Sequence, residues 1–264
     1  MSNMQDAPRQ VRPMVDVLKE FGEYRFDPAD VFRDFIDYGI GCLLVHGDLD
    51  MGKRLLDKYG ADYAKFGTML RAWIGILDKE VAGDGQWFDA LGSLYEYLAS
   101  QNKRSWLGQF FTPASVCDLM TMLTIQNIEG TGKRVNDPAV GSGRTLLSIN
   151  SRWPGNYMFG EDIDPICAKM AALNLAFHGA QGQISCLDSL RLNSWKFGYE
   201  LNPYHRHGAP PIPHLLPITE EGSVVMQHWR QRVPDVVQQP VEKVAKPAPI
   251  PEPKPVFTSQ LSLF

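Results

Sequence analysis

A glycine-rich segment with an acidic residue is the part of this sequence best suited to bind a small molecule. Residues 137–143 read Asp-Pro-Ala-Val-Gly-Ser-Gly, between a predicted strand and a helical pattern. Glycines let the backbone approach a ligand closely, and the first turn of the following helix offers unpaired N–H groups. A carboxylate at Asp137 favours a ligand with an ammonium group over one with phosphates.

Two further carboxylates extend this candidate site. Asp162 follows Gly143 by 19 residues (162 − 143), at the end of the next predicted strand, where a carboxylate accepts hydrogen bonds from ribose hydroxyls. Asp188 ends the third predicted strand, where a carboxylate can meet an adenine amino group. The alternative is structural, with an ordinary tight turn at Gly141 and Gly143 and helix caps at the two aspartates.

Several segments resemble, in the same order, the motifs of adenine-N6 DNA methyltransferases, particularly the modification subunits of type I restriction systems. These segments are the predicted helix 89–98 (DALGSLYEYL), residues 108–113 (GQFFTP), the loop 137–143 (DPAVGSG) and residues 160–164 (GEDID). The resemblance covers about residues 86–204. It implies S-adenosylmethionine as the cofactor and DNA as the substrate.

The resemblance also assigns residues to the parts of a cofactor pocket. The methionine side would be lined by Phe110, Thr112 and Pro113. The loop would hold the amino-acid end, the second acidic motif the ribose, and an apolar residue would pack on the adenine. The loop and adenosine residues are Asp137, Ala139, Gly141, Gly143, Asp162, Ile163 and Asp188. The alternative for Phe110 and Phe111 is a pair of core aromatics beside a helix start.

The candidate catalytic residues are Asn202, Pro203 and Tyr204, 14 residues (202 − 188) past Asp188. The amino group of adenine is a poor nucleophile, so a catalyst must hold it with hydrogen-bond acceptors and align it with the methyl group. The family that this chain resembles does so with an Asn/Asp-Pro-Pro-aromatic motif that also stacks on the flipped base. One proline is missing here. The alternative is an Asn-Pro turn without a catalytic role.

The last five residues resemble the peptide that binds the bacterial sliding clamp. They are Gln260, Leu261, Ser262, Leu263 and Phe264, and they follow a proline-rich stretch, 234–259. In the clamp-binding family the glutamine bonds at a pocket rim, and the two leucines and the phenylalanine fill apolar pockets. A flexible tether raises the effective concentration of such a peptide. The alternative is that the tail packs back on the domain.

The remaining sequence predicts the elements that position these residues. Residues 1–28 are expected to be flexible, 29–105 helical and 106–233 an α/β domain. Strands are predicted near 134–138, 157–160 and 183–186, with helices at 145–150 and 164–177 between them and another at 224–233. This alternation is typical of a Rossmann-like methyltransferase core with a parallel sheet. Few strands are expected after residue 204, so the sheet is expected to be short.

Composition narrows the partners. The net charge of −4 argues against strong DNA binding by the whole surface. No CxxC pair or set of histidines predicts a metal site. The N-terminus lacks a signal-peptide pattern and the longest apolar stretch, 40–45, is too short for a membrane, so a cytoplasmic protein is expected. Two functions follow: a DNA adenine-N6 methyltransferase on the clamp, with a separate specificity subunit as a further candidate partner, or a non-catalytic adaptor of the same fold.

Overall fold

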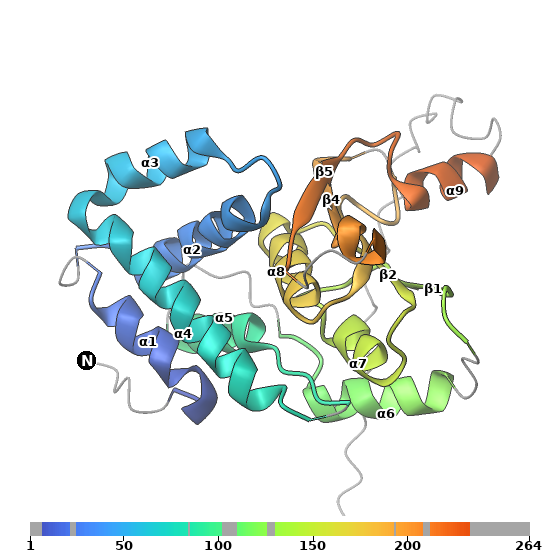
Figure 1. Cartoon of the computed structure of the whole chain (residues 1–264), viewed down its shortest axis with the longest axis horizontal. Coiled ribbons are helices and arrows are strands. Elements are labelled where there is room, and N and C mark those ends of the chain that lie inside the picture. The colour runs from blue at the N-terminus through green and yellow to red at the C-terminus, as the bar shows by residue number, and fades with distance from the viewer. Residues whose placement is uncertain are drawn as a thin grey trace, which may run out of the picture.

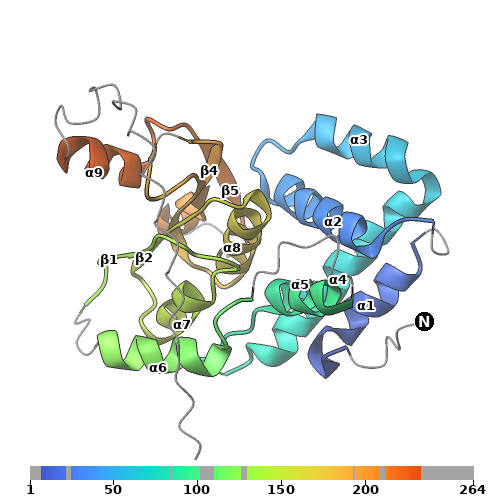
Figure 2. The same ribbon diagram turned by 180° about the vertical axis from the view of Figure 1, so that it is seen from behind.

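The computed structural model describes residues 7–21, 25–83, 85–101, 110–125, 130–192, 194–207 and 212–232. A helical region and a region built around a sheet lie side by side (Figures 1 and 2). Among the described residues, none of the helices has both the length and the apolar character needed to cross a membrane.

The helical region is made of η2, α1, α2, α3, η4, α4 and α5. Their bounds are Arg9–Val11, Arg12–Lys19, Pro28–Leu43, Leu49–Tyr59, Gly60–Tyr63, Ala64–Glu80 and Ala90–Gln101. Asp27 caps helix α2, with its side chain accepting a hydrogen bond from the Ala29 amide at 2.8 Å, and Pro28 lies in the first turn.

The prediction that residues 1–28 are flexible is wrong for residues 9–19. Val11, Met14, Val15 and Leu18 are buried, and their spacing is that of one helix face. Pro13 does not interrupt α1 because it lies in the first turn, where its missing N–H would have no helical partner.

The second region holds one sheet with the order β1-β2-β3-β4-β5 among the described residues. The strands span Arg134–Asp137, Tyr157–Asp162, Gln181–Cys186, Phe197–Leu201 and Leu215–Ile218. The helices α6, α7, α8 and α9 span Ala114–Thr124, Arg144–Arg152, Pro165–Phe177 and Val224–Arg232, and η5 spans Pro203–His207. Strands β1, β2 and β3 are parallel, which confirms the predicted α/β core.

Strands β4 and β5 were not predicted, and both are antiparallel to their neighbours. Cys186 ends β3 and pairs with Phe197, the first residue of β4, so the chain turns back on itself. Pro217 lies within β5, which is tolerated at the edge of a sheet. The sheet therefore continues past β3 in the direction away from β1.

One continuous core joins the two regions. Helix α8 is buried along most of its length, and the Phe177 ring lies 4.5 Å from that of Trp73 on α4. The chain after α2 meets the last strand, where the Val45 amide donates a hydrogen bond to the Leu215 carbonyl at 3.2 Å. The helical region thus holds the sheet and the segments that follow its strands in a fixed arrangement.

Candidate functional site

The carboxyl ends of the parallel strands meet at one edge of the sheet. Strand β1 ends at Asp137 and β2 at Asp162, and the register pairs Asp137 with Gly160 and Asp162 with Cys186. This is the edge at which open α/β sheets bind ligands. The predicted loop 137–143 therefore lies beside the predicted second acidic residue, although 19 residues separate them.

Two glycines give the loop its shape. Gly141 and Gly143 have φ of 55° and 97°, which side-chain-bearing residues seldom adopt. A Cβ on Gly141 would lie 3.0 Å from the Phe111 ring, and one on Gly143 would lie 3.4 Å from the Cα of Ala171 on α8. Gly143 also precedes the first residue of α7. The glycines therefore allow both the turn and its close packing on neighbouring segments.

Asp162 braces this loop in the described structure. Its carboxylate accepts hydrogen bonds from the Gly141 amide at 2.9 Å and the Asp164 amide at 2.8 Å. Burial raises the pKa of Asp162, while these amides counteract that effect. Asp137 makes a smaller turn of its own, accepting from the Ala139 amide at 3.1 Å. Both carboxylates retain further acceptor positions for a ligand.

The loop, Asp162 and the FTP segment line one pocket of about 190 Å³. Its lining includes five residues predicted for the cofactor, and they are Phe110, Thr112, Ala139, Gly141 and Asp162. Further lining residues that the sequence did not single out for it are Val140, Ser142, Arg144, Thr145 and Cys167, together with Phe111. The pocket thus brings together segments separated by up to 57 positions (167 − 110).

Of the two adjacent phenylalanines, Phe111 makes the closer contacts. Its ring lies 5.3 Å from that of Tyr95 and 5.4 Å from the Arg144 guanidinium, whereas Phe110 is 85% exposed at the pocket. Four other predicted cofactor residues are absent from the lining, and they are Pro113, Asp137, Gly143 and Ile163. Pro113 caps α6, and Ile163 is exposed beside the pocket residue Asp162.

Asp188 is also absent from the lining. Its carboxylate accepts hydrogen bonds from the Leu190 and Arg191 amides at 3.0 and 3.1 Å. Asp188 therefore caps a turn, close to the helix cap given as its structural alternative, and its contact with the cofactor stays a prediction.

A buried ionic network supports the pocket, and the sequence did not predict it. Asp89 is 3% exposed and accepts hydrogen bonds from the Arg144 guanidinium at 2.7 Å, the Ser142 hydroxyl at 2.5 Å and the Asn174 amide at 2.8 Å. Arg144 also pairs with Glu96 at 2.9 Å. These groups link α5 and α8 to the glycine loop.

Glu96 carries the network to the FTP segment. It accepts a hydrogen bond from the Phe111 amide at 3.0 Å, and Arg144 donates to the Thr112 carbonyl at 3.3 Å. The charged residues of the predicted helix 89–98 were the signal that could have revealed the network. Their side-chain partners lie 48 to 85 positions away, so the pairing itself was not readable from spacing.

The structure does not bring Asn202, Pro203 and Tyr204 to this pocket. Because β4 is antiparallel, its last residue, Leu201, pairs with Gly182 near the start of β3. Four residue steps of β3 separate Gly182 from Cys186, or about 13 Å at about 3.3 Å per residue. The triplet therefore lies at the opposite end of the strands from the loop 137–143. This corrects the expectation that the triplet acts at the predicted cofactor site.

The Asn202 side chain is fully engaged in holding the fold. It is completely buried with a φ of 49°, and its amide donates to the carbonyls of Ala176 and Ala180 at 3.0 and 2.8 Å. The side-chain oxygen of Asn202, Oδ1, accepts a hydrogen bond from the His214 backbone amide at 3.0 Å. The predicted alternative of a structural Asn-Pro turn describes this geometry. Tyr204 is exposed and stacks on the His214 ring at 5.2 Å.

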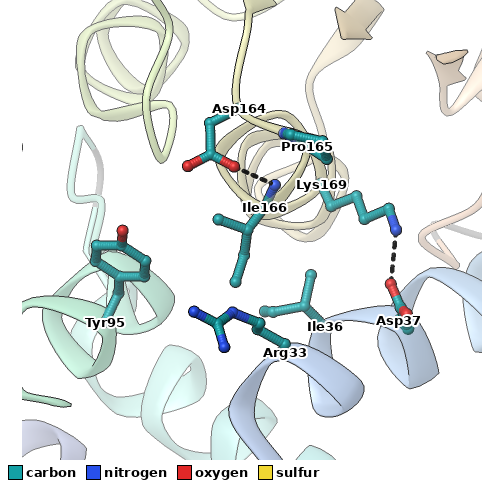
Figure 3. A pocket seen from close by; sticks show the side chains of 8 residues that line it. All are labelled: Arg33, Ile36, Asp37, Tyr95, Asp164, Pro165, Ile166 and Lys169. Carbon is teal, nitrogen blue, oxygen red and sulfur yellow. Dashed lines mark hydrogen bonds and ion pairs between the residues drawn. The ribbon is translucent and has the colours of Figure 1, made fainter. Parts of the chain in front are cut away.

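A second pocket, of about 310 Å³, lies where α2 and α5 meet the start of α8 (Figure 3). Lys169 in its wall pairs with Asp37 at 2.7 Å, and Asp164 caps α8 by accepting from the Ile166 amide at 3.0 Å. Arg33 and Tyr95 complete its polar lining. This pocket lies along the seam between the helical region and the α/β region.

The similarity of this chain to known proteins covers the segments that line the pocket beside Gly141. Residues 86–203 match the family model N-6 DNA Methylase. The chain is 35% identical over 103 residues to the type I restriction enzyme HindI methylase subunit of Haemophilus influenzae, covering 34% of this chain and 22% of that protein. It is 29% identical over 111 residues to the MjaIX methylase subunit of Methanocaldococcus jannaschii, covering 38% and 19%.

Among solved structures, the chain is similar to the methyltransferase subunit of a type I restriction-modification system from Streptococcus thermophilus. The identity is 26% and the TM-score 0.32, over 65% of this chain and 36% of that one. The chain thus spans about a fifth of the length of the two curated relatives.

Proposed function

We propose that this chain binds S-adenosylmethionine in the pocket beside Gly141 and acts in adenine-N6 methylation of DNA of the restriction-modification type. The observation that carries the proposal is the convergence of the FTP segment, the DPAVGSG loop and Asp162 on one pocket. These segments lie within the residues that match the N-6 DNA Methylase family model.

The chemistry of the pocket fits this cofactor. The Asp162 carboxylate in the pocket wall suits the ribose hydroxyls, and the left-handed glycines permit close backbone approach. The Asp137 carboxylate, at the start of the loop but outside the pocket lining, would suit the ammonium group. Phe110, Thr112 and Pro113 would enclose the methionine side, with Ile163 and Asp188 toward the adenine. When bound, the cofactor supplies a sulfonium methyl group for transfer. The chain's own residues would orient that group and exclude water from it.

DNA is the proposed substrate, and a separate specificity subunit is a proposed partner. The names of the relatives support this, since both are methylase subunits of type I restriction enzymes. A net charge of −4 suits a protein that relies on partners to hold DNA.

The sliding clamp is the second proposed partner. Gln260, Leu261, Leu263 and Phe264 lie outside the described residues, as does the proposed linker 234–259. We expect deletion of residues 260–264 to abolish binding to the purified bacterial clamp in surface plasmon resonance. Unchanged clamp binding by the truncated protein would contradict this part of the proposal.

A second candidate function is a methyltransferase-like adaptor that binds the cofactor and the clamp without transferring a methyl group. The observation that favours it is the position of Asn202, which is buried and saturated with hydrogen bonds at the edge opposite the pocket. In this function, cofactor binding at the pocket would modulate a replication or defence complex.

Transfer of tritiated methyl groups to unmethylated DNA distinguishes the two functions, with cofactor binding measured in parallel. Tyr204→Ala is a suitable variant because Tyr204 is exposed and its loss leaves the core intact. Transfer by the wild type that Tyr204→Ala abolishes supports a catalytic triplet. Transfer that survives in Tyr204→Ala excludes a catalytic role for Tyr204, and cofactor binding without any transfer favours the adaptor.

A further inference from the structure

The cofactor loop follows a strand at the edge of the sheet. In doubly wound α/β folds the strand order reverses beside the first strand, so strands lie on both of its sides and the ligand binds at the reversal. Here β2 and β3 lie on one side of β1, and no described residue pairs with its other side. The described sheet therefore has strands on one side of β1 only, and the loop 137–143 follows its outermost strand.

The free edge of β1 is able to accept another strand. The Tyr157 amide donates to the Lys133 carbonyl at 2.7 Å, so the alternation of the strand turns the backbone groups of Arg134 and Asn136 away from β2. An edge of this kind is a template for strand addition. A strand that adds in parallel would end beside Asp137, at the same end of the strands as the loop 137–143.

Helix α6 presents an apolar face at the same end of the molecule as β1 (Figures 1 and 2). The exposed fractions of Val116, Leu119, Met120 and Leu123 are 40%, 51%, 45% and 62%. Their spacing of i, i+3, i+4 and i+7 places them on one face, turned away from Cys117, which is buried. Large apolar side chains gathered on one exposed face indicate an interaction surface.

Charge indicates the chemistry of what covers this surface. Lys133 and Arg134 are exposed at the start of β1, and neither forms an ion pair with any residue that the structure describes. A specific interface needs about 800 Å² from each partner, so the helix face and the strand edge would both contribute. We propose that β1 and α6 dock a second polypeptide, which adds an apolar parallel strand flanked by Asp or Glu.

This inference rests on the proposed function for what the partner supplies. The residues after a strand added to β1 would reach the cofactor pocket, which Asn202 and Tyr204 do not reach. The partner is therefore expected to carry the acceptor groups that hold the adenine amine, and the two chains together would form one catalytic domain.

Site-specific photo-crosslinking in the native host tests the proposal. The photo-reactive residue p-benzoylphenylalanine replaces Leu119 in the full chain, and the same residue at Leu56 is the matched control, since these leucines are 51% and 50% exposed. We expect at least tenfold more adduct at position 119, mapping to an apolar segment with flanking carboxylates in a different polypeptide. Reversing both charges, Lys133→Glu with Arg134→Glu, should lower that yield at least tenfold.

The purified partner should also slow amide hydrogen exchange at Arg134 and Asn136. An adduct with a second copy of this chain, an adduct with residues 233–264, or no excess over the Leu56 control would overturn the proposal. Calorimetric titration of S-adenosylmethionine into Leu119→Glu separates this outcome from the proposed function, because cofactor binding should be retained there whether or not docking occurs.

Discussion

Replacing Arg144 by methionine is expected to destabilise the fold and to loosen the cofactor pocket together. The variant keeps much of the aliphatic volume but leaves the Asp89 carboxylate, whose side chain is 2% exposed, without its cationic partner. Removing one member of a buried ion pair costs about 3–5 kcal/mol. At about 2–4 °C per kcal/mol for a chain of this size, Tm should fall by roughly 10 °C.

The same change should weaken cofactor binding, because Arg144 holds both Glu96 and the Thr112 carbonyl. Arg152→Met is the matched control at the other end of α7. The Arg152 side chain is 34% exposed and pairs with Asp118 at 3.5 Å, so its loss should cost under about 1 kcal/mol. The assays are urea unfolding and calorimetric titration of S-adenosylmethionine.

A double-mutant cycle isolates the ion pair. Because Asp89→Asn removes the stranded charge, the free-energy cost of Arg144→Met should be smaller by about 1–3 kcal/mol in that background. If Arg144→Met costs no more than Arg152→Met, or if the two changes at Arg144 and Asp89 are additive, the network does not support the pocket and the reasoning is refuted.

Three further predictions concern the sheet and the loop. Burial raises the pKa of the Glu161 carboxyl to about 7, so the folded protein binds the carboxyl proton more tightly than the unfolded chain does. The stability gained from this protonation is present below about pH 4.5 and is lost as pH rises towards 7. Glu161→Gln should therefore raise the unfolding free energy by about 2–3 kcal/mol at pH 8 and hardly at pH 4.5 in urea melts, and an equal gain at both values would contradict this. Gly141→Ala should cost about 1–2 kcal/mol, displace Phe111 and weaken cofactor binding in calorimetry, whereas unchanged affinity would show that the loop geometry is not needed. Asn202→Ala should lower stability by about 2–4 kcal/mol through three lost hydrogen bonds yet leave cofactor affinity unchanged at 10 °C, and lost affinity in a folded variant would argue for a role in the pocket.

The part of the fold that sequence reasoning predicted is the part with strong local signals. The glycines of 137–143, the proline at the start of 165–177 and the apolar strands between them act within a few residues of each other, and the structure has β1, α7, β2, α8 and β3 in that order. Helix α1 lies in the segment expected to be flexible, and its Pro13 is compatible with a helix because it lies in the first turn.

The antiparallel direction of β4 follows from the short connection that precedes it. Only ten residues (197 − 186 − 1) separate Cys186 from Phe197, and a parallel crossover needs about a dozen or more. An antiparallel β4 follows, and it carries Asn202 to the wrong edge for catalysis at the pocket. By its spacing from Asp188, the triplet of Asn202, Pro203 and Tyr204 stands where the family motif is expected. Only the structure shows that the triplet lies away from the pocket.

S-adenosylmethionine is expected to bind in the pocket lined by Phe111, Gly141 and Asp162. Calorimetric titration of the cofactor into the wild type, Asp162→Ala and Lys169→Ala tests it most directly, because Lys169 lines the other pocket, shown in Figure 3. We predict saturable binding to the wild type and Lys169→Ala, and a loss of at least tenfold in affinity for Asp162→Ala. No binding to the wild type, or equal binding to wild type and Asp162→Ala, would contradict the claim.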